Sequence, residues 1–101
     1  MWILVFFDLP VQDPAQRKNY TRFRKKLLSK GLVALQFSVY YRYCNSQAAA
    51  DALVTHLKNH LPPEGQVRFL PLSERAFSQM SVFENRILQA PEQPPESFVL
   101  F

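Results

Sequence analysis

Asp8 is the residue whose position most strongly suggests chemistry. It follows the apolar run 2–7, and this unbroken hydrophobicity predicts a central strand that is covered on both faces. A carboxylate there usually has a partner or a function, and the carboxyl end of a strand is a common place for a site. The alternative is a structural Asp that caps local amides and starts a turn before Pro10. One carboxylate is too little to hold Mg²⁺, but two copies of Asp8 that met at this strand end could share one ion.

A second candidate is a cationic segment at residues 14–31. It holds seven of the twelve Lys and Arg residues and no acid: Arg17, Lys18, Arg22, Arg24, Lys25, Lys26 and Lys30. On a helix, four of them would lie opposite the apolar stripe, namely Lys18, Arg22, Lys25 and Lys26. Such a face suits either plain solvation or contact with several phosphates. Arg17 and Arg24 would lie on the flank of that stripe, where a planar guanidinium can reach a partner surface or a phosphate.

Other types of active site have weaker support in the sequence. His56 and His60 are four residues apart, but zinc needs a third ligand and Cys44 is the only other Cys or His. Cys44 also has no convincing His/Asn constellation for a nucleophile. Two glycines in the chain leave no glycine-rich phosphate loop, and the Gly- and aromatic-rich signature of RNA-recognition domains is not found.

The elements that must position these residues follow from local signals. A helix is predicted over roughly 14–30, with Asp13 as N-cap, Gln16 completing a capping box and Gly31 as the left-handed C-terminal residue. The β-rich stretch 32–44 is long for one strand and predicts two short strands that break near 36–38.

The second half of the fold is predicted in the same way. Asn45 or Ser46 should cap another helix that Pro62 and Pro63 stop, and 66–72 alternates with the period of a strand. The order is β-α-β-β-α-β, so residues 1–72 are expected to form an α+β, ferredoxin-like domain. Residues 73–101 form an extension, with short strands expected at 80–83 and 98–101. These strands could extend the sheet or pair with a second copy.

Composition limits the class of protein. The 101 residues suffice for one domain, 48% are hydrophobic and 14% are aromatic, and the net charge is +4. A domain of this size has a thin stability margin, which pairing with itself would improve. The charge asymmetry suits a polyanion partner. The single cysteine favours a reducing compartment, and the apolar run 2–7 is too short to span a bilayer, so a cytoplasmic protein without a membrane partner is expected.

Three stretches in order carry a resemblance to a known family. They are Phe-Asp-Leu-Pro at 7–10, Tyr-x-x-Phe-Arg-Lys at 20–25 and Gln-Phe-Ser-Val-Tyr at 36–40. Together with Arg68 to Leu72 and the closing Phe98 to Phe101, they resemble CRISPR-associated protein 2, the small subunit of the spacer-acquisition machinery, in its type II version. The resemblance covers residues 1–72 well and the tail more loosely.

The resemblance implies a ferredoxin-like homodimer that exchanges or adds C-terminal strands across its interface and binds Mg²⁺ through Asp8. It also implies a complex with the CRISPR integrase, in which the dimer bridges two integrase dimers and holds duplex DNA. Members have been assigned metal-dependent endonuclease activity on single-stranded RNA or duplex DNA. By position, Asp8 would be the catalytic residue, Phe37 and Ser38 would lie near it, and Arg17 and Arg24 match basic helix positions.

Three functions therefore remain open at the level of sequence. The first is a scaffold that clamps DNA for the integrase, and the second is a metal-dependent phosphodiesterase. The third is a ferredoxin-like regulatory or small-ligand-binding module, which would not need the acid-free basic helix.

Overall fold

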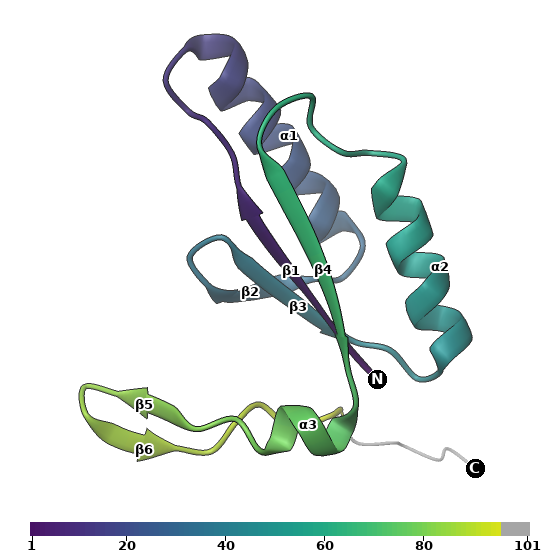
Figure 1. Cartoon of the computed structure of the whole chain (residues 1–101), viewed down its shortest axis with the longest axis vertical. Coiled ribbons are helices and arrows are strands. Elements are labelled where there is room, and N and C mark those ends of the chain that lie inside the picture. Colours follow the sequence, from purple (N-terminus) through teal and green to yellow (C-terminus); the bar gives the residue numbers. More distant parts are fainter. Residues whose placement is uncertain (96–101) are drawn as a thin grey trace.

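The computed structural model describes residues 1–95 and shows one four-stranded antiparallel sheet with two long helices on the same face (Figure 1). The elements of this unit are β1 Trp2–Asp8, α1 Pro14–Ser29, β2 Val33–Gln36, β3 Val39–Tyr43, α2 Gln47–Lys58 and β4 Gln66–Leu72. The strand order is β2-β3-β1-β4. The predicted α+β, ferredoxin-like fold is confirmed, and β1 is the central strand that its continuous apolar sequence indicated.

Local signals place the ends of α1 where the sequence predicted them. The Asp13 side chain accepts from the Gln16 backbone N–H at 2.7 Å, and the Gln16 side chain accepts from the Asp13 N–H at 3.3 Å. This capping box satisfies two of the amides that a helix start leaves without partners. Gly31 ends the helix with a φ of 80°, a conformation that costs a glycine little. α2 begins at its predicted cap, Ser46, but ends at Lys58, before the two prolines.

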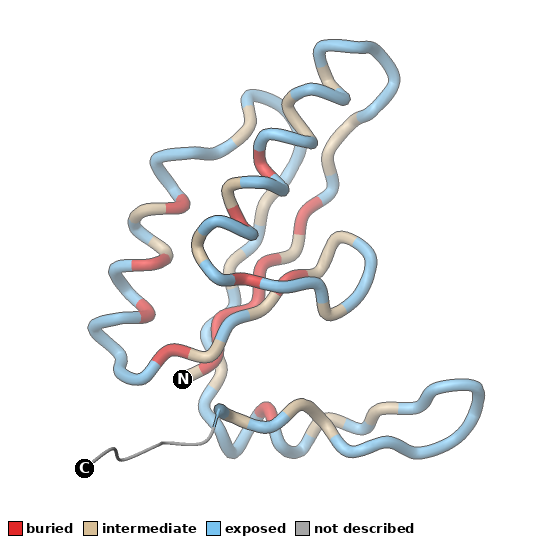
Figure 2. The backbone as a smooth tube through the Cα atoms, turned by 180° about the vertical axis from the view of Figure 1, so that it is seen from behind, coloured by how far each residue is buried: buried red, intermediate tan, exposed pale blue. Residues whose placement is uncertain are grey.

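Apolar residues of β1 alternate between the two faces of the sheet and serve two separate cores. Ile3, Val5 and Phe7 pack with Phe23 and Leu27 of α1 and with the buried residues of α2. Trp2 and Leu4 point to the opposite, open face. In Figure 2 the buried positions follow the central strands and the sheet-facing sides of the helices. The apolar residues of β1 are therefore buried on both faces, as its sequence predicted, although beyond the α3 contact at Trp2 the second face of the sheet stays open.

The C-terminal extension differs from the prediction. A short helix, α3 Glu74–Ser78, follows β4, and its Phe77 ring stacks on Trp2 with centroids 4.1 Å apart. The strand expected at 80–83 is β5 Val82–Glu84, and it pairs with an unpredicted strand, β6 Ile87–Gln89. The turn between β5 and β6 has positive φ at Asn85 and Arg86, and neither position is the glycine that would have predicted a hairpin turn from the sequence. The expected strand 98–101 lies outside the described residues.

The β5–β6 hairpin projects from the main sheet, and its residues are mostly exposed (Figure 2). The two strands form a separate two-stranded sheet. Within residues 1–95, no helix combines the length and the apolar character that a membrane crossing requires.

Candidate functional site

Asp8 is the last residue of β1, and its side chain is exposed. It lies opposite Gln66, the first residue of β4. The two strands approach closely here, because a Cβ atom on Gly65 would lie only 2.5 Å from the Asp8 carbonyl oxygen. Gly65 also has a φ of 90°, so both its space and its backbone conformation require glycine. The position of Asp8 is thus set by its pairing with Gln66 of β4 and by the close approach of the chain at Gly65.

A hollow opens beside Asp8 at this end of the sheet. Phe37 and Ser38 line it from the β2–β3 turn, and Gln66 and Arg68 line it from β4. The structure therefore brings the three residues Asp8, Phe37 and Ser38 together. It adds Gln66 and Arg68, which were not singled out from the sequence. The period-two alternation of 66–72 was the available signal, since it places Gln66 and Arg68 on one face of the strand.

The turn that carries Phe37 is anchored to β1. The Phe7 backbone N–H donates to the Ser38 carbonyl at 3.1 Å, and Val39 pairs with Phe6. Ser38 adopts a φ of 61°, and Phe37 is 90% exposed. An exposed aromatic ring and an exposed carboxylate therefore lie at the same end of the sheet.

The donor groups around Asp8 can supply only part of the coordination of a Mg²⁺ ion. Among residues 1–95 there is no group of three or more His, Cys, Asp or Glu side chains that could hold a metal. Mg²⁺ commonly binds through one or two carboxylates and fills its remaining positions with water and phosphate oxygens. Asp8, with the Gln66 side-chain amide in the same hollow, suits that partial coordination and does not suit a cage made by this chain alone.

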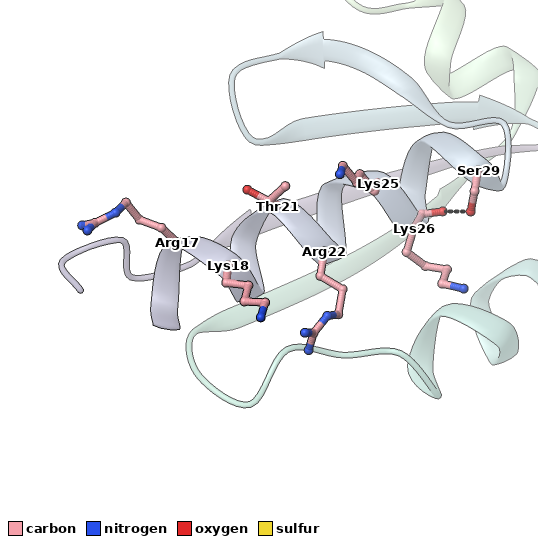
Figure 3. A pocket seen from close by; sticks show the side chains of 7 residues that line it. All are labelled: Arg17, Lys18, Thr21, Arg22, Lys25, Lys26 and Ser29. Carbon is pink, nitrogen blue, oxygen red and sulfur yellow. Dashed lines mark hydrogen bonds between the residues drawn. The ribbon is translucent and has the colours of Figure 1, made fainter. Parts of the chain in front are cut away.

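Basic side chains cover one face of α1. Figure 3 shows Lys18, Arg22 and Lys26 projecting from the same side of the helix, and a shallow hollow follows them. Arg17 and Lys25 line the same hollow. Residues four apart on a helix are separated by about 6 Å along the axis, so the charges form a regular row. α1 carries no acidic residue, so no carboxylate of the helix itself neutralises this row.

Arg17 and Arg24 have separate contacts. The Arg17 guanidinium donates to the carbonyl oxygens of Val11 and Gln12, both at 3.2 Å, and so braces the loop before the helix. Arg24 donates through Nε to the Tyr40 hydroxyl at 3.0 Å. Arg24 does not line the hollow on α1, so the structure separates it from the other five basic residues predicted to contact nucleic acid.

Cys44 and the two histidines lie elsewhere. Cys44 is buried, and this burial raises the pKa of its thiol. His56 and His60 lie with their ring centroids 4.5 Å apart. Burial lowers the pKa of His56, and Lys30, His60 and Lys26 lower it further.

Comparison with known proteins adds the family. The family described as CRISPR associated protein Cas2 matches residues 1–80. A CRISPR-associated endoribonuclease Cas2 of Parvibaculum lavamentivorans is 39% identical over 101 residues, which is all of both chains. A protein of the same name from Paracidovorax avenae is 40% identical over all of this chain and 94% of its own. The crystal structure of Streptococcus pyogenes Cas2 at pH 6.5 superposes with a TM-score of 0.61 over 83% of this chain and all of that chain. At 20% identity, it supports the fold.

Proposed function

The chain belongs to the Cas2 family of CRISPR-associated proteins, and from this premise we propose that its homodimer is an adaptation subunit that holds duplex DNA for the CRISPR integrase. The observation that carries the proposal is the acid-free basic face of α1, defined by Arg17, Lys18, Arg22, Lys25 and Lys26. Cations in a row neutralise phosphates without reading base sequence. A protein that must accept any incoming DNA needs this kind of contact.

A second copy is expected to cover the open face of the sheet. Leu70 is 41% exposed there, although its partner in the pairing register, Leu4, is buried. The β5–β6 hairpin adds Phe83, Ile87 and Leu88, each more than half exposed. Exposed apolar surface of this extent commonly marks a contact with another protein. We assign residues 1–72 to the ferredoxin-like domain and residues 73–101 to an extension that pairs at this interface.

The dimer would carry two α1 faces and two Asp8 carboxylates. Two basic faces extend the length of duplex that can be held, and paired Asp8 side chains supply the second carboxylate that one protomer lacks. Bridging of integrase dimers would use a surface other than the α1 face and the Asp8 hollow. The extension is the mildly acidic part of the chain, and its charged side chains, which include Glu74, Glu84 and Glu92, are the candidates for that contact beside the apolar residues that pair the two copies.

Phosphodiester cleavage is a second activity of the same proposal. The relatives carry the name endoribonuclease, and Asp8 would hold Mg²⁺ together with water and substrate phosphate. When bound, the ion would supply positive charge at the phosphate and an activated water. Of the residues in the hollow, Arg68 can bind a phosphate oxygen and Asp8 can orient the water. RNA and DNA both present this phosphodiester.

The duplex contact is tested by removing charge from α1. A triple variant, Lys18→Gln, Arg22→Gln and Lys26→Gln, should bind duplex DNA more weakly. It should also lower the slope of log affinity against log salt by about 2.7 for each α1 face in contact, at about 0.9 per phosphate contact. The measurement is fluorescence anisotropy across a salt series, in a chelator so that nothing is cut.

The matched control removes the same charge elsewhere, through Lys58→Gln, Arg75→Gln and Arg86→Gln. Its salt slope should stay near that of the unmodified protein. Equal losses in the two triple variants would show that only net charge matters. A flat salt response in the unmodified protein would favour the regulatory or small-ligand module instead.

A further inference from the structure

Phe37 occupies a position where the fold gives no reason for a large apolar residue. It is the first residue of the two-residue turn between β2 and β3, where Gly, Asn and Asp are the usual choices. Ser38 adopts the left-handed conformation of this turn and Phe37 does not, so the backbone conformation does not select the residue type at position 37. With 90% of its surface exposed, the ring adds almost nothing to either core.

The turn that carries the ring is nevertheless held in place. The turn is fixed by the Phe7 N–H to Ser38 carbonyl hydrogen bond and by pairing of Val39 with both Phe6 and Gln36. Figure 1 shows this turn beside the carboxyl end of β1. An aromatic residue on an anchored turn loses little conformational entropy when a flat partner stacks on it.

The groups around the ring match the parts of a nucleotide. Arg68, Gln66 and Asp8 line the same hollow, and Arg68 Nη2 donates to Gln66 Oε1 at 3.2 Å. An aromatic face can stack on a base, a guanidinium can bind a phosphate, and an amide or carboxylate can bind the edge of a base. The buried centre of a protein–protein contact is depleted in charged residues, so these neighbours favour a nucleotide over an apolar protein segment.

We propose that Phe37 is a stacking platform for an unpaired nucleobase, so that the hollow beside Asp8 takes a single-stranded segment while α1 contacts duplex phosphates. The inference rests on the proposed function, in that the ligand is a nucleic acid. We expect a single-stranded ligand for a geometric reason: the bases of a duplex are stacked on one another, so they have no free face for the Phe37 ring. Phe37 would then determine which phosphodiester lies next to Asp8.

The first test compares single and double strands. Phe37→Ala should weaken binding of a short oligoadenylate about tenfold, within the roughly 5- to 150-fold range of one stacked base, and leave duplex DNA of equal length unchanged. Phe37→Trp should retain the affinity, and Phe37→Leu should lose it, because leucine is apolar without a π face. All binding is measured by anisotropy in a chelator, with ribo- and deoxy-oligoadenylate as separate arms.

Val33→Ala is the matched control, since Val33 lies on the same hairpin, is 49% exposed and is absent from the hollow. It should leave both affinities unchanged. If Phe37→Ala leaves oligoadenylate binding intact, or weakens duplex binding equally, the stacking role is wrong. Light scattering of each variant gives a further check, because a Phe37→Ala protein that loses its association state would make Phe37 a contact between copies.

A spectroscopic readout separates this inference from the proposed function. The natural tryptophan, Trp2, is 2% exposed, so Phe37→Trp introduces an indole that alone is accessible to a stacked base within residues 1–95. Its fluorescence should be quenched by adenosine monophosphate more strongly than by ribose 5-phosphate. Quenching that persists in the α1 triple variant supports the platform even if duplex holding fails. Equal quenching by the two probes would overturn the platform while leaving duplex holding intact.

Discussion

At the residue scale, Asp8 and Phe37 are neighbours only because strands pair. Asp8 ends β1, Phe37 begins the turn before β3, and the antiparallel register of β1 with β3 brings the two together. Each residue is exposed, so neither is held there by the hydrophobic effect. Core packing therefore does not account for this exposed aromatic ring and carboxylate, which is consistent with the proposed binding role.

Asp8→Asn should reduce Mg²⁺-dependent cleavage of RNA or DNA by roughly a hundredfold or more, because loss of a metal ligand costs at least as much as loss of a supporting group. Folding should be unaffected, since the amide keeps the shape of the exposed side chain. Asp51→Asn, at an exposed carboxylate on α2, is the control and should cleave normally. Nuclease assays in vitro are run beside spacer acquisition in cells.

The paired assays distinguish the two proposed activities. Retained acquisition with lost cleavage would make cleavage dispensable for adaptation. Acquisition that disappears while the dimer and the integrase complex stay intact would contradict a purely structural role for Asp8.

At the element scale, α2 places a histidine beside the cationic end of α1. His56 Nε2 is buried and has no hydrogen-bond partner among the described residues. Its pKa is lowered by burial first and then by Lys30, His60 and Lys26, so charges near the C-terminal ends of both helices act on it. The neutral imidazole is therefore the form that the folded protein favours.

Stability should fall as the pH drops through the ordinary histidine pKa of 6.5. Below that value the unfolded chain binds a proton at His56 before the folded chain does, so protons favour unfolding. At higher pH His56 is neutral in both the folded and the unfolded state, so it no longer makes the stability depend on pH. Urea unfolding between about pH 7.5 and 5.5 should show this slope, and it should flatten in His56→Gln. His60→Gln should retain most of it; equal flattening in both variants would count against His56 as the source.

At the scale of the whole molecule, the chain is flat and only one sheet face is covered by the two long helices. Its extents are 47 × 38 × 21 Å, and the second face has α3 over Trp2 at one end while Leu70 stays partly exposed. A sheet face this apolar is more stable when covered. This shape is the physical argument for the homodimer.

Leu70→Glu should dissociate the proposed homodimer, because it would place an unpaired charge in the proposed interface. The expected cost is about 3 kcal/mol, or more than a hundredfold in the dimer dissociation constant. Leu28→Glu is a matched control, since Leu28 is 42% exposed against 41% for Leu70. Leu28 belongs to α1, which lies on the other side of the sheet from Leu70. Sedimentation over a concentration series measures both. A Leu70→Glu protein that remains dimeric would place the interface elsewhere.

Much of the fold could be predicted from local signals in the sequence. The Asp13–Gln16 capping box, Gly31 and the continuous apolar strand 2–7 act over a few residues, so their structural consequences can be predicted without tertiary contacts. The extension was predicted less well. α3 depends on Phe77 packing against Trp2, which is distant in sequence, and the β5–β6 turn lacks the glycine that usually marks one.

The candidate site divides in the same way. The sequence by itself determined that Asp8 ends the first strand and that α1 carries a row of cations without acids, because strand ends and helix faces follow from periodicity. Only the tertiary structure decided that Arg68 and Gln66 join Asp8 and Phe37, and that Arg24 turns to Tyr40 and leaves the basic row. Strand order and register decide which of these side chains lie together. Both arise from pairing between residues that are far apart in the chain.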